Sequence, residues 1–167
     1  MNSKNANIAI LLVIIVIAIF VTLGFFGIGG LNFGAEPAQT SMQEILSELQ
    51  STGTVSALRT EDLVEGTGAP VVAGDALTVH YVGALPDGTV FDSSVERGVP
   101  FEFTIGAGTV IQGWEQGLLG MKKGGQRLLV IPPSLGYGAT GVGNIPPNST
   151  LVFQVELLEI APASSGQ

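Results

Sequence analysis

An uninterrupted run of apolar residues near the amino terminus divides this chain into two parts that fold in different surroundings. Residues 8–28 read IAILLVIIVIAIFVTLGFFGI, and no charged side chain occurs between Lys4 and Glu36. As a helix this run is ~31 Å long, which matches the hydrocarbon thickness of a bilayer. A buried helix of a soluble domain would carry a polar stripe, and this run has none. The sequence therefore predicts a transmembrane helix at 8–28, preceded by a short tail at 1–7.

An uncleaved signal anchor and a cleavable signal peptide are the two alternatives for such a run. Its length favours an anchor, because the apolar core of a signal peptide usually has about 7–15 residues. Phe33 also lies where a cleavage site would require a small residue. We therefore expect a single-pass membrane protein, with secretion after cleavage as the alternative.

The charges on either side of the run predict its orientation. Lys4 precedes it, and three glutamates follow it: Glu36, Glu44 and Glu48. Because basic flanks tend to remain in the cytoplasm, we expect the rest of the chain to be extracytoplasmic.

Residues 29–54 are predicted to be a linker that contains one short helix at about 41–50. Ser41 lies three residues before Glu44, as in a capping box. Three apolar residues then share one face of this helix: Ile45, Leu46 and Leu49. Since the apolar stripe is shorter than two heptads, it favours a spacer over a dimerisation helix.

Charge and composition exclude several classes of function. Six Lys and Arg against 14 Asp and Glu give a net charge of −8 at pH 7. Such a surface repels phosphate backbones, so we expect no nucleic-acid partner. The chain has no cysteine and only one histidine, His80, which excludes disulfides and metal sites built from several Cys or His. We therefore expect no metal site of that kind.

After residue 54 the pattern changes to short strands around one helical stretch. Apolar and polar residues alternate at 76–83, 101–105, 126–131 and 150–160, as in strands with one buried face. Residues 110–121, VIQGWEQGLLGM, have apolar residues at helical spacing. We predict an α+β domain at 55–161, in which one curved sheet packs on this helix. A flexible tail at 162–167 ends the chain.

The predicted helix contains glycines, although each costs about 1 kcal/mol relative to alanine. Gly113 and Gly117 are four residues apart and share one side, which predicts a close approach of the sheet. Trp114 would then lie either in an aromatic core or at the bottom of a cleft. The long glycine-rich loop at 136–150 favours a cleft, because loops of this kind are usually functional.

Three motifs occur in a fixed order: VHYVGALPDGTVFDSS, VIQGWEQGLLGM and YGATG followed by IPPNSTLVFQVELLEI. With these motifs, residues 58–160 closely resemble the FKBP-type peptidyl-prolyl cis-trans isomerases. The resemblance implies an antiparallel half-barrel of five to six strands wrapped around one short helix, with a proline-binding pocket between them. It also implies a monomeric domain, proline-containing polypeptides as substrates and macrolide-type compounds as inhibitors.

The resemblance also implies the residues of the site. Trp114 is similar to the floor on which the prolyl ring stacks, and the Ile111 amide and Tyr137 hydroxyl are similar to donors for the substrate. Asp92 matches the family's pocket carboxylate, so the implied catalytic residues are Asp92, Tyr137 and Ile111. The implied substrate-binding residues are Tyr81, Phe91, Phe101, Phe103, Val110, Trp114, Ile145 and Phe153. Phe101 and Val110 could equally be core residues.

Two features of the chain depart from simple expectation. Strict alternation would turn Phe91 and Asp92 to opposite faces, so both reach the pocket only if the strand breaks at "DSS". The loop after "YGATG" often begins with His in the family and is one residue longer, whereas this chain has Val142 and Asn144. The rim is therefore altered, and substrate preference does not carry over.

The reaction that the resemblance implies needs no nucleophile, metal or cofactor, since rotation about a prolyl bond breaks no bond, and we expect none. His80 falls on the opposite strand face from Tyr81, so we expect it to be structural. The barrier is about 20 kcal/mol. An apolar pocket desolvates the planar, dipolar amide, and well-placed donors stabilise the twisted one. A peptide-binding or chaperone module with vestigial isomerase activity is the first alternative. A surface-anchored interaction protein that uses its acidic face is the second.

Overall fold

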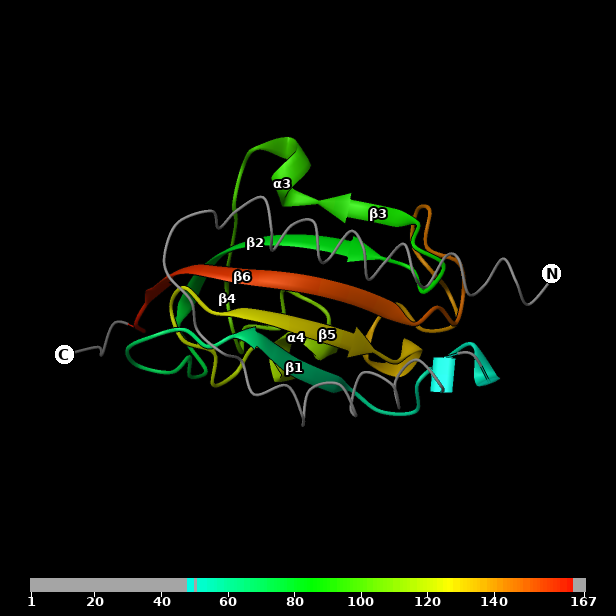
Figure 1. The fold of residues 1–167 in the computed structure, drawn as a ribbon, viewed down its shortest axis with the longest axis horizontal. Helices are drawn as coiled ribbons and strands as arrows, with labels where there is room; N and C mark the ends of the chain where they lie inside the picture. The colour runs from blue at the N-terminus through cyan, green and yellow to red at the C-terminus, as the bar shows by residue number, and fades with distance from the viewer. Residues whose placement is uncertain (1–47, 50, 164–167) are drawn as a thin grey trace, which may run out of the picture.

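One curved antiparallel sheet forms most of the part of the chain that the computed structural model describes, residues 48–49 and 51–163. In the order β1-β5-β6-β2-β3, five strands lie side by side, and β4 also pairs with β2 (Figure 1). The six strands are β1 (Arg59–Val64), β2 (Ala76–Ala84), β3 (Val90–Ser93), β4 (Phe101–Thr104), β5 (Gln126–Ile131) and β6 (Leu151–Ala161).

Strands β2 and β6 form the centre of the sheet, as their alternating patterns predict. In β2 every second residue is buried, and Tyr81 lies opposite Val155 of β6. The strands predicted at 76–83, 101–105, 126–131 and 150–160 are confirmed, with ends that differ by at most one residue. Strand β1 was not expected from the sequence, because RTEDLV is an edge strand whose side chains are mostly exposed.

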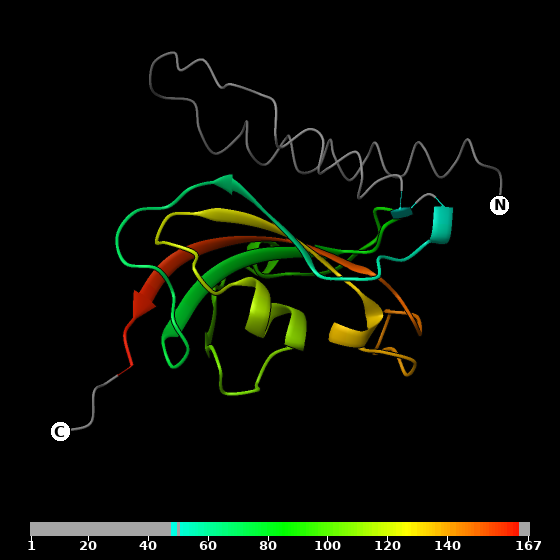
Figure 2. The same ribbon diagram turned by 90° about the horizontal axis from the view of Figure 1, so that it is seen from below.

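Helix α4 (Gln112–Gly117) lies under the arch of the sheet, and the loop that follows β5 is on the same side (Figure 2). Two other short helices are α3 (Ser94–Arg97), directly after β3, and η1 (Pro133–Leu135). The pattern at 110–121 predicts a longer helix than the structure has. Its apolar spacing continues beyond α4 because Leu118 and Met121 are buried in the turn that follows.

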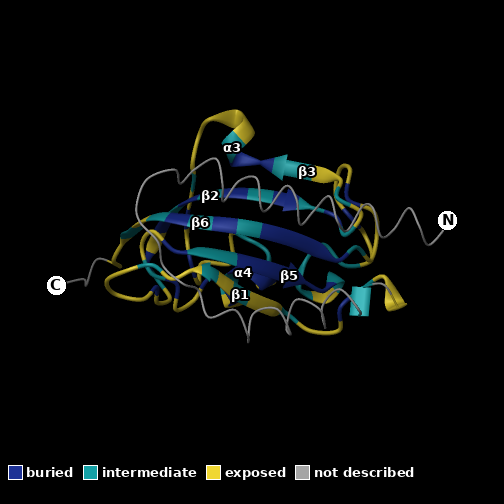
Figure 3. Ribbon diagram, in the orientation of Figure 1, coloured by how far each residue is buried: buried dark blue, intermediate teal, exposed yellow. Residues whose placement is uncertain are grey.

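The sheet buries apolar residues on both faces, in two clusters of different size. In Figure 3 the buried colour runs along β2, β5 and β6, while the edge strand β1 is mostly exposed. The larger cluster lies between the sheet and α4 and contains every buried aromatic residue of the described part of the chain. The smaller cluster includes Leu128, Val130 and Val152, and Val55 and Leu49 cover it. Residues 48, 49, 51 and 52 are helical, while the rest of the helix predicted at 41–50 lies outside the described residues.

The predicted transmembrane helix at 8–28 also lies outside the described residues. Within 48–49 and 51–163, no helix is long and apolar enough to cross a bilayer. The antiparallel sheet of six strands around short helices agrees with the expected fold. The predicted boundaries of the domain, 55–161, stay a prediction.

Candidate functional site

A cavity of about 690 Å³ opens between α4, the sheet and the loop at 136–150. Side chains from β2, β3, β4, α4 and β6 reach it, so five segments far apart in the sequence meet there. Its lining consists of Tyr81, Phe91, Asp92, Phe101, Thr109, Val110, Ile111, Trp114, Tyr137, Val142, Gly143, Asn144, Ile145 and Phe153.

Trp114 forms the floor of this cavity and is only 4% exposed. Tyr81 and Phe153 contact it edge to face, with ring centroids 5.1 Å and 5.3 Å away. Phe103 is buried 5.5 Å from the Trp114 ring and does not line the cavity, so it supports the floor from behind. The indole N–H of Trp114 is buried and has no hydrogen-bond partner in the described part of the chain. The floor is thus an apolar surface whose position is fixed by contacts with three other aromatic rings.

The two glycines of α4 let the floor sit directly on the sheet. A Cβ atom on Gly113 would overlap the side chain of Ile131, and one on Gly117 would lie 2.7 Å from Leu129 Cδ2. Such contacts are far shorter than normal van der Waals separations, so only glycine fits at this distance. The predicted close approach of helix and sheet is confirmed.

Phe91 and Asp92 both line the cavity, although they are adjacent in β3. The register between β2 and β3 shifts here, because Gly83 pairs with Asp92 while Ala84 pairs with Val90. Phe91 is therefore the extra residue of a β-bulge, which re-aims neighbouring side chains toward one face. The strand does end within "DSS", as expected, because β3 stops at Ser93 and α3 begins at Ser94, but the irregularity next to Asp92 is the bulge at Phe91.

Asp92 belongs to a polar network at the wall of the cavity. The Tyr81 hydroxyl donates to one carboxylate oxygen, and the Arg97 guanidinium donates to the other. Arg97 also donates to the Tyr81 hydroxyl at 3.0 Å. Arg97 was not identified from the sequence, because its contact depends on α3 turning back over β3. The residue sequence VERG after the serines is the only local sign of that turn, with Ser93 as N-cap and Gly98 as C-cap.

The network sets the ionisation of the site. Burial acts to raise the pKa of Asp92, but hydrogen bonds from Tyr81 and Arg97 and the charge of Arg97 outweigh it, so the pKa is lowered. Burial and the hydrogen bond to Asp92 raise the pKa of Tyr81. Burial and the charge of Asp92 also raise the pKa of Tyr137. Asp92 therefore stays a carboxylate and both phenols stay protonated around neutral pH.

Two donors at the cavity are available to a ligand. Ile111 precedes the first residue of α4, and no described residue accepts a hydrogen bond from its amide N–H. The Tyr137 hydroxyl likewise has no partner within 48–49 and 51–163, and its ring is partly buried against the core. An apolar floor between two free donors suits a ligand with a compact apolar ring and carbonyl oxygens on either side.

A short turn forms the rim. Val142 and Ile145 form an antiparallel bridge, with N–H···O distances of 3.1 Å and 2.8 Å, and Gly143 and Asn144 occupy its tip. Ile145 is buried, whereas Val142 is 56% exposed. Thr109 is a further rim residue that the sequence did not single out.

His80 lies away from the cavity lining. Its Nδ1 is 3.0 Å from the Ser94 hydroxyl, which also accepts from the Tyr81 amide at 2.8 Å. Among the residues that the structure describes, no group of His, Asp and Glu is arranged to hold a metal ion. Of the eleven sequence-predicted site residues, only Phe103 lies outside the lining of the cavity.

Comparison with known proteins places this site in a family. A family model described as FKBP-type peptidyl-prolyl cis-trans isomerase matches residues 68–158. A Neisseria meningitidis serogroup A protein named FK506-binding protein is 52% identical over 107 residues, 64% of this chain and 98% of that protein. FK506-binding protein 2 of Dictyostelium discoideum is 61% identical over 89 residues, 53% of this chain and 67% of that protein.

Comparison with a solved structure agrees with the family match. The crystal structure of AtFKBP13 has a TM-score of 0.59 and 45% identity, and the match covers 65% of this chain and 96% of that one. The family match extends over more than half of the chain and includes every residue that lines the cavity. The chain belongs to the FKBP-type peptidyl-prolyl cis-trans isomerase family, and it is an isomerase of that type.

Proposed function

We propose that this chain is a membrane-anchored, monomeric prolyl isomerase that acts outside the cytoplasm on exported polypeptides. The catalytic part of the proposal rests on one observation, the apolar cavity with Trp114 as its floor and with the Ile111 N–H and Tyr137 hydroxyl, which bond to no described residue, in its lining. The membrane part rests on the uncharged apolar run at 8–28 and the acidic residues that follow it.

In the proposed mechanism the prolyl ring stacks on Trp114 between Tyr81 and Phe153. The preceding amide then loses water, which weakens its dipolar planar form relative to the twisted form. The Ile111 N–H and the Tyr137 hydroxyl donate to substrate carbonyl oxygens and hold the chain on both sides of the rotating bond. Asp92 fixes the Tyr81 ring through the phenol and transfers no proton.

The donor role of Ile111 can be tested by a substitution that removes its N–H. Its φ is −62°, close to the value that proline requires, and its N–H bonds to no described residue. Ile111→Pro deletes the donor, while Ile111→Ala deletes the side chain and keeps the donor. We expect kcat/KM for a proline peptide, measured by exchange NMR, to fall about tenfold or more in Ile111→Pro relative to Ile111→Ala.

Equal kcat/KM in the two variants would remove Ile111 from the mechanism. Peptide binding by the native chain without acceleration of isomerisation would instead favour the peptide-binding or chaperone module. Tyr137→Phe provides a second donor deletion, which we expect to lower kcat with little change in stability.

The anchor is tested separately by fractionation of cells and the mass of the mature chain. An uncleaved anchor predicts a membrane fraction that resists carbonate extraction and a mass that includes residues 1–28. A soluble chain that begins after residue 28 would show instead that the run is a cleaved signal peptide.

A further inference from the structure

Helix α4 carries the pocket floor but has little stability of its own. It spans Gln112–Gly117, two of its six residues are glycine, and neither a side-chain N-cap nor a basic residue in its last turn supports it. Isolated helices shorter than about 12 residues are marginal in water. The position of Trp114 must therefore come from what α4 touches.

One face of β5 supplies three successive contacts to this helix. Ile131 packs against Gly113 and Leu129 packs against Gly117. Arg127 is the next residue on the same face, and its Nη1 donates to the carbonyl oxygens of Gly117 at 2.8 Å and Leu119 at 2.9 Å. The carboxyl end of a helix has unpaired carbonyls and partial negative charge, so a guanidinium there stabilises it.

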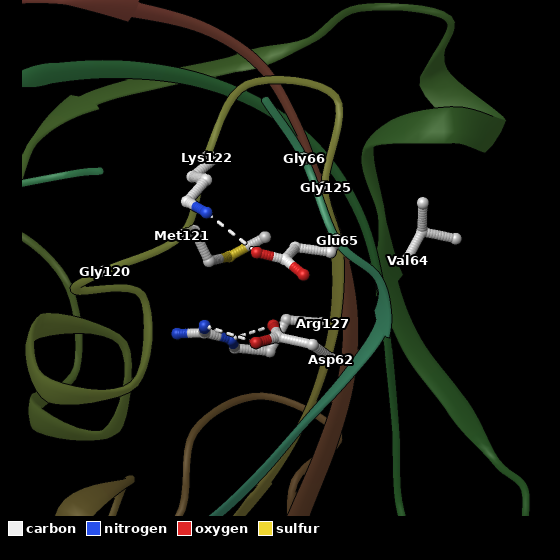
Figure 4. A pocket seen from close by; sticks show the side chains of 9 residues that line it. All are labelled: Asp62, Val64, Glu65, Gly66, Gly120, Met121, Lys122, Gly125 and Arg127. Carbon is white, nitrogen blue, oxygen red and sulfur yellow. Dashed lines mark hydrogen bonds and ion pairs between the residues drawn. The ribbon is translucent and has the colours of Figure 1, made fainter. Parts of the chain in front are cut away.

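The other edge of the guanidinium is fixed by Asp62. Arg127 lies opposite Asp62 in the β1–β5 ladder, and its Nε and Nη2 donate to the two carboxylate oxygens at 2.6 Å and 2.9 Å. Figure 4 shows the side chain crossing from β5 toward the turn at Gly120, with Asp62 alongside it. The Arg127 side chain is only 12% exposed, so its orientation is restrained by packing as well as by the bidentate pair.

Arg127 and Asp62 line a small cleft together with Lys122 and Glu65. These last two form a second ion pair, which has none of the features of the first. Lys122 pairs with Glu65 at 2.7 Å, but the two side chains are 36% and 77% exposed. Within the described residues the Lys122 ammonium bonds only to Glu65, whereas Arg127 donates to two carbonyl oxygens at the end of α4. Removing the cation of the Lys122–Glu65 pair is therefore a matched control for removing that of the Arg127–Asp62 pair.

We propose that Arg127, held by Asp62, is a positioning residue for isomerisation: it fixes the carboxyl end of α4 and thereby the Trp114 ring. The proposal rests on the isomerase activity of the site and is independent of membrane anchoring. We call these contacts of Arg127, with Asp62 on one side and the carbonyl oxygens of Gly117 and Leu119 on the other, the clamp. When the clamp is lost, α4 still packs through its glycines but tilts, and the Trp114 floor no longer matches the prolyl ring. Peptide affinity then falls more than the turnover of bound peptide.

The test uses the full-length chain in detergent, with Arg127→Met, Arg127→Lys, Asp62→Asn and the control Lys122→Met. Trp114 is the only tryptophan, so its emission reports the floor directly. We expect Arg127→Met to shift this emission and to raise KM for a proline peptide about tenfold with a smaller change in kcat, since small misplacements of binding groups have effects of this size or larger. Arg127→Lys should recover part of the peptide affinity that Arg127→Met loses. The KM of Lys122→Met should stay within about twofold of the native value.

The proposal would be overturned by an Arg127→Met chain that folds and has the tryptophan emission and the KM of the native protein, even if its thermal stability were lower. If Arg127→Met fails to fold, Asp62→Asn decides, because it keeps the guanidinium and removes only the charge that orients it. An Asp62→Asn chain with native emission and KM would also overturn it. Emission shifts without peptide would support the clamp even if every activity assay failed, which separates this inference from the proposed mechanism.

Discussion

The floor and the rim of the cavity are built in opposite ways. On the floor, Trp114 and Phe153 come from a helix and a central strand, and each is only 4% exposed. On the rim, Val142 lies in a loop turn and is 56% exposed. Floor residues contact several other rings, while the rim turn is closed mainly by its own backbone hydrogen bonds.

This difference separates what the fold requires from what the substrate requires. Close packing means that a floor residue cannot change size without disturbing its neighbours. A rim residue whose side chain points to solvent can change with little effect on stability. We therefore expect the type of reaction to depend on the floor and the choice of peptide to depend on the rim.

The strongest contrast is expected from Phe153→Ala. Its ring contacts Tyr81, Phe91 and Trp114, so truncation opens a large void in the floor. We expect the free energy of unfolding to fall by about 3–5 kcal/mol and peptide affinity to be lost. Chemical denaturation measured by tryptophan fluorescence checks the first effect. Val142→Ala is the rim control, and a similar loss of stability in both variants would break the comparison.

Gly113→Ala tests whether the floor depends on contact between α4 and β5. The new Cβ would overlap Ile131, so we expect a loss of about 1–3 kcal/mol in the free energy of unfolding. Alanine alone should strengthen the helix by about 1 kcal/mol, so a destabilising result isolates the clash. In an Ile131→Ala background the overlapped atoms are gone, and Gly113→Ala should become neutral or stabilising. The same loss in both backgrounds would contradict this explanation.

Asp92 lies in the wall of the cavity, and its contribution to the free energy of unfolding is expected to depend on pH. Its pKa is lowered in the folded chain, because hydrogen bonds from Tyr81 and Arg97 outweigh the opposing effect of burial. A lowered folded pKa stabilises the fold above the unfolded value of about 3.9, and this stabilisation is lost as pH falls through the folded value. Native stability should therefore fall more steeply below about pH 4 than that of Asp92→Asn.

Urea denaturation between pH 7 and pH 2.5 measures this difference. Arg97→Met removes the cation that helps lower the pKa and should reduce the slope as well. Equal slopes in all three proteins would show that the network does not couple Asp92 to folding. We also expect Asp92→Asn to lower kcat/KM, because the Tyr81 ring loses its carboxylate partner.

The difference between regular strands and irregular segments also explains which parts of the site could be predicted from the sequence. The aromatic residues that surround the Trp114 floor could be predicted, because Tyr81, Phe103 and Phe153 lie on the inward faces of β2, β4 and β6, and a regular strand determines which side chains share a face. The bulge at Phe91 and the contact of Arg97 depend on how β3 meets β2 and on the turn of α3. Neither leaves a periodic signal. Phe103 shows a further limit, since alternation predicts that a side chain faces inward but not whether it lines a cavity or supports it.

The smallest effect is expected at the rim, where Val142→Ser should alter selectivity alone. Val142 lines the cavity and is 56% exposed, and Val72 is equally exposed but lies outside the cavity lining. If a bound peptide covers about one methylene of Val142, its removal raises KM about fourfold for peptides with an apolar residue before proline. Peptides with Ala, Leu or Glu before proline measure this, with kcat and stability expected to stay native. Because Val72→Ser matches the exposure and the chemistry, an identical peptide profile in the two variants would show that the rim turn does not select substrate.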